Sequence, residues 1–446
     1  MLGKFYQSPG ALSHPPGLLY HDGMELIPAT SVGISASPPL RPSPRAAPTS
    51  LLLLLLATLL IPAVWRLVLT LQVGFKPDIA SEFGALVHLR PLDYFSGWTA
   101  LALLSLADYF AAPGQRLDHR IASVLLAAGL AMFVLSLLLG DASQRALLDL
   151  IVGAALALLA VHHVLRTFSS LRSAAGLTLP DLWRLLCSQW LLVWATAEVF
   201  LHIRYHVDGI AAQESARTIL LLLPAAGLLP NVLMALGIQW WGSLGGYSAE
   251  RPPRWRAWLL AAVLLNVGAA LVMIGANARF GWAIAGTTLM LLALLLYLAG
   301  FSRRRALMVV ISWTLLAAAL ALLLLDRVMH FSGQIVPELL AILWRHLLAV
   351  GFPTLWLLGI GVMVLRGRLA APLQMRRLTK GICVTFLIGA LLGAGLLLAG
   401  LSNRSMIQWL WIAYALEALA LIVAALVTLR TLNLLRRSSP PPHPAK

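Results

Sequence analysis

The chain has 446 residues, of which 60% are hydrophobic and only 11% are Asp, Glu, Lys or Arg. Soluble globular proteins carry about 25% charged residues, so this composition excludes an ordinary soluble enzyme or binding module. The formal net charge is +16, but the basic residues stand in short runs between apolar blocks. That arrangement is typical of cytoplasmic loops in a membrane protein and argues against a nucleic-acid partner.

The two ends of the chain differ in composition from its middle. Residues 1–50 are rich in proline and serine and end in "SPPLRPSPRAAPTS". We expect a disordered tail there, without the layout of a signal peptide. Residues 431–446 contain "RRSSPPPHPAK" and are predicted to form a disordered C-terminal tail. Between them, residues 51–430 are predicted to form one transmembrane helical domain.

Apolar runs recur throughout this domain. A run of about 18 or more apolar residues is long enough to cross a bilayer as a helix. The pattern predicts an all-α, polytopic transmembrane helical bundle of about 12 spans. Their approximate bounds are 51–73, 92–112, 121–139, 145–165, 182–203, 217–240, 257–275, 281–300, 305–325, 338–365, 379–400 and 408–430. Pro224, Pro230 and Pro353 lie within spans and predict kinks, and Gly389 and Gly393 form a GxxxG pattern that favours close helix packing.

The basic residues orient the bundle. If the spans alternate in direction, 22 of the 33 lysines and arginines fall in the two tails and every second connection, and 8 fall on the other side. Short loops rich in lysine and arginine stay in the cytoplasm. We therefore expect both termini to be cytoplasmic.

A few ionisable residues lie inside apolar segments. Each costs roughly 2.5–3.5 kcal/mol on insertion scales, so such residues are the first candidates for a functional site. Glu198 and His202 stand one helical turn apart in "EVFLHIRYH", Arg345 and His346 are adjacent, and Glu417 lies in the last span. An ion pair of Arg345 with Glu417 or with Glu198 would neutralise two buried charges. Such a pair would be either structural or part of a proton or ligand path.

Five histidines fall toward the non-cytoplasmic side: His88, His202, His206, His330 and His346. Neutral imidazole is a ligand for iron, copper and zinc, and haem iron usually takes a histidine. A metal-bound histidine needs an acceptor for its other N–H, and Glu198 is placed to serve His202 in this way. Arg345 is suited to pair with a haem carboxylate. The alternative is that these histidines sit at the membrane interface with their rings half in water.

No catalytic signature accompanies these residues. The sequence shows no P-loop, HExxH or GxSxG in a context that supports catalysis. The two cysteines, Cys187 and Cys383, stand alone in apolar segments and form neither a disulfide framework nor a CxxC site. Whether the protein is an enzyme stays open at this stage.

One stretch resembles a known family. "ILWRHLLAVGFPTLWLLGIGVMVLRGR" (342–368) resembles the late helix of the NnrS family, which has a pattern of the type "HALTVGAxGxMxLGVMxR". The positions that follow this spacing are His346, Val350, Gly351, Gly359 and Met363. "EVFLHIRY" resembles the family's "ANLLFHLG", which would place a family histidine at His202.

The resemblance implies a twelve-span bacterial membrane protein linked to nitric oxide stress, with haem or copper. It is not uniform along the chain. The family's HAHEM-type motif is replaced by "VHLRPLDYFSGW" (87–98), which keeps one histidine, His88. The family's "GHTGR" has become "RGRLAAP".

Two classes of function therefore compete. The first is an NnrS-like protein of the bacterial cytoplasmic membrane with a haem or copper site near the periplasmic face. That site would use His346 and His202, with His88 as a third ligand, Glu198 orienting His202, and Arg345 beside the cofactor. The second is a secondary transporter in which Glu198, Arg345 and Glu417 form a site at the middle of the membrane. A non-catalytic membrane subunit is a further alternative. In each case the lipid bilayer is the partner that the composition predicts.

Overall fold

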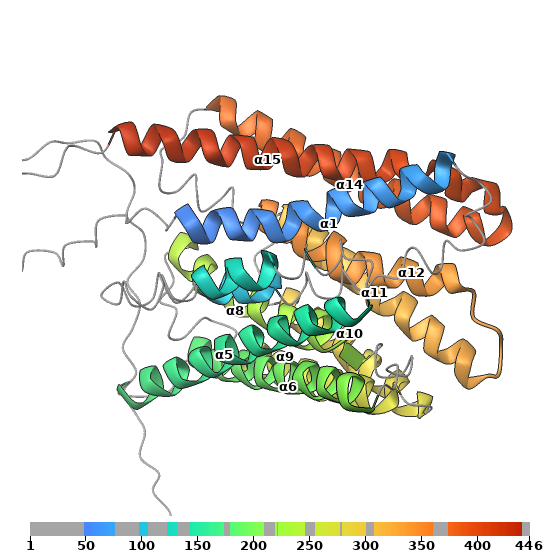
Figure 1. Ribbon diagram of the computed structural model, residues 1–446, viewed down its shortest axis with the longest axis horizontal. Helices are drawn as coiled ribbons and strands as arrows, with labels where there is room; N and C mark the ends of the chain where they lie inside the picture. The colour runs from blue at the N-terminus through green and yellow to red at the C-terminus, as the bar shows by residue number, and fades with distance from the viewer. Residues whose placement is uncertain are drawn as a thin grey trace, which may run out of the picture. The chain divides into compact units, whose positions relative to one another are not determined.

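The computed structural model describes residues 49–75, 98–105, 123–131, 135, 142–173, 179–208, 219–220, 222–245, 255–276, 279–299, 307–359 and 373–438. Every regular element in these ranges is helical, so the predicted all-α class is confirmed for them (Figure 1). The elements are α1 (Thr49–Phe75), α5 (Ala142–Ser173), α6 (Leu179–Asp208), η2 (Leu223–Leu228), α8 (Leu229–Gly245), α9 (Trp255–Gly275), α10 (Phe280–Ala299), α11 (Leu307–Phe331), α12 (Glu338–His346), η3 (Leu347–Gly351), α14 (Leu373–Ser402), η4 (Arg404–Trp409) and α15 (Leu410–Ser438). Residues 98–105, 123–131 and 352–359 are also helical.

The predicted boundaries of the two tails compare differently with the ends of the first and last helices. The N-terminal tail lies outside the described residues, except that Thr49 and Ser50 already belong to α1. At the other end α15 continues to Ser438, beyond position 430, where the sequence placed the start of the C-terminal tail. This boundary is a correction: the segment "TLNLLRRS" has no proline, and the helix runs on until the proline-rich end is near.

Six helices in the described part of the chain are long and apolar enough to cross a membrane. They are Arg256–Gly275, Phe280–Ala299, Val310–Phe331, Leu339–Gly359, Leu378–Ser402 and Arg404–Arg430. Shorter apolar helices lie at Leu53–Val68, Gly153–Ser169 and Leu223–Ile238. The total of about twelve spans and the cytoplasmic position of both termini stay predictions.

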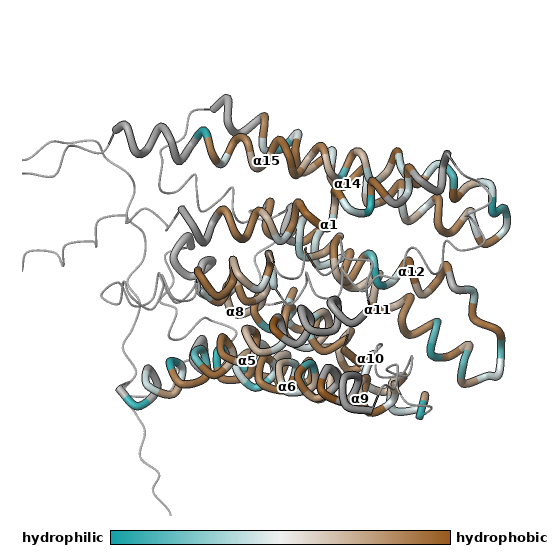
Figure 2. The backbone as a smooth tube through the Cα atoms, viewed as in Figure 1, coloured by the Kyte–Doolittle hydropathy of each residue, from teal (hydrophilic) through white to brown (hydrophobic). Residues whose placement is uncertain are grey.

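The helices are apolar on their outer faces as well as inside (Figure 2). Leu158, Leu165, Leu295 and Leu426 are each exposed by 60% or more. A soluble protein rarely exposes so much contiguous apolar surface, because burying it from water is favourable. Helices with apolar surface on all sides fit a lipid environment, so contact with a bilayer follows from this pattern.

Two prolines coincide with π-helical turns. In η2, which contains Pro224, the backbone N–H of Leu229 donates to the Pro224 carbonyl. In η3, the N–H of Phe352 donates to the Leu347 carbonyl just before Pro353. A proline lacks an N–H and pushes the preceding turn open, so a widened turn at these positions has a local cause. The kinks predicted from Pro224 and Pro353 therefore take the form of π-helical turns.

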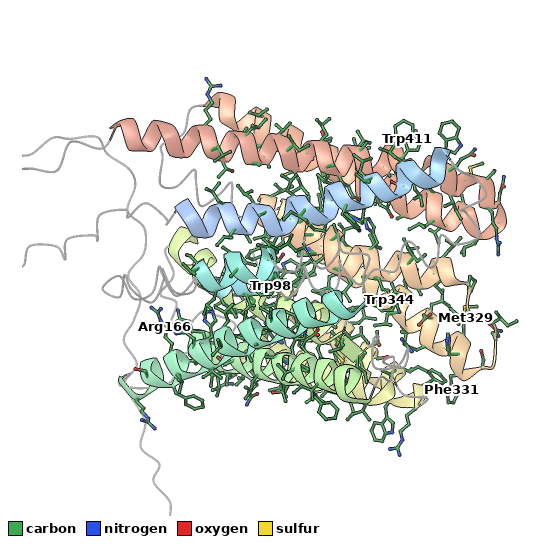
Figure 3. All side chains as sticks on the ribbon, viewed as in Figure 1. Trp98, Arg166, Met329, Phe331, Trp344 and Trp411 are labelled. Carbon is green, nitrogen blue, oxygen red and sulfur yellow. The ribbon has the colours of Figure 1, made fainter. Side chains whose placement is uncertain are left out.

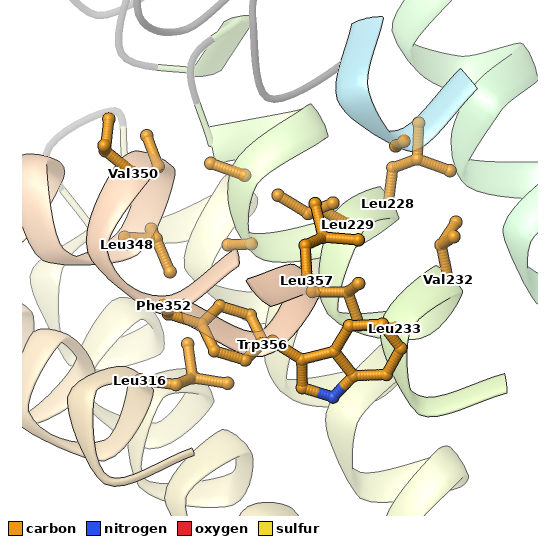
Figure 4. Packing of buried hydrophobic residues seen from close by; sticks show 14 of the residues in the cluster. Leu228, Leu229, Val232, Leu233, Leu316, Leu348, Val350, Phe352, Trp356 and Leu357 are labelled. Carbon is orange, nitrogen blue, oxygen red and sulfur yellow. The ribbon is translucent and has the colours of Figure 1, made fainter. Parts of the chain in front are cut away.

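The two π-helical regions are buried in the same apolar core (Figure 4). Leu228 and Leu229 lie on one side, and Leu348, Val350 and Phe352 on the other. All five are at most 6% exposed. The irregular backbone is thus held inside protein, which is where a membrane protein tolerates it.

Small residues bring neighbouring helices close together. A Cβ added to Gly268 in α9 would lie 2.6 Å from the Gly286 carbonyl oxygen in α10, and one added to Gly389 in α14 would lie 2.9 Å from that of Ala413 in α15. No side chain fits into such gaps without a shift. Close packing is therefore confirmed at Gly389, whereas a Cβ added to Gly393 would make ordinary contact, 3.5 Å from Ala413 Cβ.

The connection between α11 and α12 has a specific geometry. Gly333 has φ +73°, a conformation that favours glycine, and its N–H donates to the His330 carbonyl while that of Gln334 donates to the Met329 carbonyl. These two bonds are a Schellman motif, which ends α11. Pro337, in an extended conformation, then precedes α12. The two helices pack against each other as an antiparallel pair.

Candidate functional site

Three ionisable side chains from three helices meet inside the protein. Arg66 of α1 donates a hydrogen bond from Nη2 to Glu417 Oε2 of α15 at 2.6 Å, and its Nη1 donates to Nδ1 of His346 in α12. His346 Nε2 lies 3.1 Å from Glu417 Oε1. Arg66 is 5% exposed, His346 1% and Glu417 0%. We call Arg66, His346 and Glu417 the polar cluster.

The hydrogen bonds define the state of His346. Arginine has no acceptor atom, so Nδ1 of His346 must supply the lone pair that receives the Arg66 N–H. The ring proton is therefore on Nε2, facing Glu417 Oε1. The Nε2–Oε1 pair is within ion-pair distance but lacks the alignment of a hydrogen bond. With a neutral imidazole, the charges of Arg66 and Glu417 cancel.

The surroundings shape the polar cluster. The guanidinium carbon of Arg66 lies 4.7 Å from the centroid of the Tyr414 ring, and the His346 ring centroid is 5.5 Å from the same ring. Gly389 and Gly393 of α14 leave the space on the other side: added Cβ atoms would lie 3.0 Å from Glu417 Cγ and 3.9 Å from His346 Nε2. The Tyr414 ring thus covers one side of the polar cluster, and the two glycines, which have no side chain, leave room for it on the other side.

Glu417 lies at the midpoint of the candidate span Arg404–Arg430. A carboxylate there cannot reach water by bending toward a helix end, so it must be neutralised within the protein. Arg66 does this with a charge-assisted hydrogen bond, which is shorter and stronger than a neutral one. Removing one partner of such a buried pair typically costs about 3–5 kcal/mol, because the other charge is left uncompensated.

The structure brings together two of the predicted site residues, His346 and Glu417. It separates Arg345 from them. Arg345 belongs to the same helix as His346, but its guanidinium carbon lies over the Trp344 ring, 5.3 Å from the ring centroid. The sequence offered Arg345 as the partner of Glu417, and Arg66 takes that place. Adjacent helical residues point about 100° apart, so Arg345 and His346 serve different faces of α12.

Glu198 and His202 both belong to α6. Glu198 is 2% exposed, and its Oε1 accepts a hydrogen bond from Trp194 Nε1 at 3.1 Å. The side chain of His202 lies outside what the structure describes, so the predicted contact between Glu198 and His202 stays a prediction. His88 lies outside the described residues altogether.

His346 does not fit the role of a haem or copper ligand in this arrangement. A metal needs the lone pair of a ring nitrogen, but Nδ1 receives the Arg66 N–H and Nε2 carries the proton. Among the residues that the structure describes, no three or more His, Cys, Asp or Glu side chains gather closely enough to hold a metal ion. The predicted haem or copper site would therefore depend on His202 and His88.

Sequence reasoning missed Arg66. It lies inside the first apolar run, and its partner Glu417 is 351 positions away. The signal was present: a carboxylate in one apolar segment requires a cation in another, and few segments contain one. Only the packing of α1 against α15 decides which cation it is (Figure 1).

Comparison of the chain with models of known protein families, with curated proteins and with solved structures gives no match.

Proposed function

We propose that the chain is a secondary transporter, a multi-pass protein of a bacterial cytoplasmic membrane in which the polar cluster couples a solute to a proton. The observation that carries this proposal is the buried contact of Arg66, His346 and Glu417 at the middle of an apolar helix. Ionisable residues at such a depth are rare, and they mark ion paths and proton relays. Among the functions that the sequence allowed, transport uses this cluster most directly.

The cluster offers a definite proton step. A proton arriving at Glu417 Oε1 or Oε2 neutralises the carboxylate and removes the partner of Arg66. The cluster then changes from zero net charge to +1, and α1 loses its charge-assisted bond to α15. The Nε2–H of His346 lies 3.1 Å from Glu417 Oε1, where it favours the ionised carboxylate over the protonated one. Loss or gain of one proton thus changes how three helices are held.

The backbone beside the cluster suits a moving part. His346 is the last residue of α12, and the π-helical turn η3 begins at the next position. Single π-helical turns in longer helices often accompany function, because the widened turn can shift its hydrogen bonds. A proton at Glu417 is therefore coupled to a helix that already has an irregular turn.

Flux into proteoliposomes tests the proposal. The vesicles hold a pH-sensitive dye, are held at zero membrane potential with equal potassium concentrations and valinomycin, and receive succinate, lysine or alanine in separate runs. We expect one class of solute to acidify the interior. Glu417→Gln and His346→Asn should abolish that signal, because the first removes the carboxyl that takes the proton and the second removes the imidazole that contacts both Arg66 and Glu417. Arg279→Gln, which changes an exposed arginine outside the cluster, should leave it unchanged.

An NnrS-like role in nitric oxide stress is the second candidate. One observation favours it: His346, which carries the resemblance to that family, is buried and contacts both Arg66 and Glu417. The absorption spectrum and the iron and copper content of the purified protein test it. A colourless protein free of both metals would contradict this candidate, and haem bound through His202 or His88 would support it.

A further inference from the structure

A second group of charges lies where α11 packs against α12. Asp326 and Arg327 belong to the last two turns of α11, and Arg345 belongs to the last turn of α12. The antiparallel packing of α11 and α12 brings Arg345 alongside the end of α11 that holds Asp326 and Arg327. Met329 and Phe331 mark this end of α11 in Figure 3, and Trp344 marks α12. We call Arg327 and Arg345 the arginine pair.

The arginine pair is incompletely neutralised. Asp326 is the acidic residue beside it, and its Oδ2 lies 3.4 Å from Arg327 Nε without forming a hydrogen bond. Arg327 is 7% exposed and Asp326 3%. Within the described residues, Nε of Arg327 and Nε of Arg345 are both buried and have no hydrogen-bond acceptor. Counted over the described residues, two cations and one carboxylate leave a net charge of +1 in a mostly buried place.

The described neighbours of the arginine pair do not supply the missing acceptor. His330 Nδ1 bonds to the Asp326 backbone carbonyl, and its ring packs on Phe280 of α10. The guanidinium carbon of Arg345 lies 5.3 Å from the centroid of the Trp344 ring, a cation–π contact that supplies no hydrogen-bond acceptor. Trp344 Nε1 is likewise buried and without an acceptor in the described structure. These are unsatisfied donors next to an excess positive charge.

We propose that Arg327 and Arg345 bind a soluble oxyanion, a carboxylate or a phosphate, and that the transported solute is therefore an anion. The inference rests on the proposed transport function. Planar guanidinium groups match the two oxygens of such anions and bind them by paired hydrogen bonds. The Asp326 carboxylate interacts with Arg327 of this pair and therefore competes with the anion for it.

The placement links this site to the proton. Arg345 and His346 are consecutive residues of α12, so one helix carries the anion contact on one face and the polar cluster on another. A rotation of α12 about η3 would move both at once. A positive site beside a protonatable one is the arrangement that an anion–proton symporter needs, because the proton offsets the charge that the anion brings.

Equilibrium dialysis of the purified full-length protein against radiolabelled phosphate tests the anion site, with succinate as competitor and chloride keeping the ionic strength constant. We expect saturable phosphate binding that succinate displaces. Arg327→Gln and Arg345→Gln should each weaken it by about ten-fold or more, because each variant removes one positive charge and its charge-assisted hydrogen bonds to the anion. Arg345→Lys should weaken it less, because the charge remains and only the paired geometry is lost.

Two further variants guard against a folding artefact. Asp326→Asn should tighten phosphate binding several-fold, a gain that misfolding cannot produce. Arg279→Gln removes an exposed arginine beside Phe280, near the same helix ends, and should change nothing. Absence of saturable binding, or equal binding in the wild type, Arg327→Gln and Arg345→Gln, would overturn the proposal. Weaker binding in Asp326→Asn would overturn it as well.

The source of the oxyanion is tested in nanodiscs. If phosphate binds equally in phosphatidylcholine discs and in discs that contain phosphatidylglycerol, the ligand is a soluble anion, as proposed. If phosphatidylglycerol displaces the phosphate, the arginine pair holds a lipid headgroup, and the assignment to a solute fails.

The two proposals fail separately. Phosphate binding with the expected variant pattern but without any flux would keep the anion site and remove the transport function. Acidification driven by lysine or alanine, and not by succinate, would keep transport and remove the anion as its solute.

Discussion

The buried negative charge of Glu417 is neutralised by Arg66. The carboxylate is completely buried at the middle of an apolar helix, and the arginine that neutralises it belongs to the first helix of the described chain. Because the Arg66 side chain also bonds to Nδ1 of His346, the same cation sets the charge balance and the histidine tautomer. At this scale, sequence reasoning identified His346 and Glu417 but not their partner, since pairing between distant segments is decided by tertiary packing.

A double-mutant cycle measures this dependence. Glu417→Gln and Arg66→Met should each lower the thermal midpoint of the detergent-solubilised protein, corresponding to a loss of about 3–5 kcal/mol, because one buried charge is left alone. The double variant should be less destabilised than the two losses added together, with a coupling of about 1 kcal/mol or more between the sites. Arg279→Met, at an exposed position, is the control. Simple additivity of the two losses would show that the pair contributes no net interaction.

Single helices are where the sequence was most informative. The apolar runs predicted helices, Gly389 and Gly393 predicted close packing, and Pro224 and Pro353 predicted local irregularity, because each of these effects depends on residues close together in the chain. The π-helical form of the irregular turns could not be predicted. It depends on burial of η2 and η3 in a shared core, which involves residues more than 100 positions apart.

The glycines of α14 allow a matched test at the scale of one helix. A methyl group at Gly389 would press on the Ala413 carbonyl and on Glu417 Cγ. Gly389→Ala should therefore destabilise the protein by about 1–3 kcal/mol through overpacking. Gly395, in the same helix, has nothing within 4 Å of an added Cβ, so Gly395→Ala should be neutral or stabilising by up to about 1 kcal/mol. If the two variants have the same thermal midpoint, α14 and α15 are not in the close contact described.

Across the whole molecule, the charges outside the helices have a pattern that the helices alone do not explain. Along the sequence, Arg303, Arg304 and Arg305, and then Arg366 and Arg368, stand in connections that alternate with those at positions 332–337 and 403. The composition and the apolar surfaces predicted a membrane protein. The described residues contain six candidate spans, and the total of about twelve stays a prediction from the sequence.

Cysteine labelling tests the orientation without that count. Gln334 lies in the turn between α11 and α12, Lys380 lies near the start of α14, and both are exposed. One candidate span, Leu339–Gly359, separates them, and at about 1.5 Å per residue it is long enough to cross a bilayer. The native cysteines, Cys187 and Cys383, are buried, so the background should be low. In intact cells a membrane-impermeant maleimide should label Gln334→Cys, and Lys380→Cys only after permeabilisation. The reverse result would mean that the bundle has the opposite orientation, and labelling of both from one side would mean that Leu339–Gly359 does not cross.

With the expected result, the arginine pair lies toward the outer end of α11. An anion that enters from outside would then reach the arginine pair before it reaches the level of Glu417.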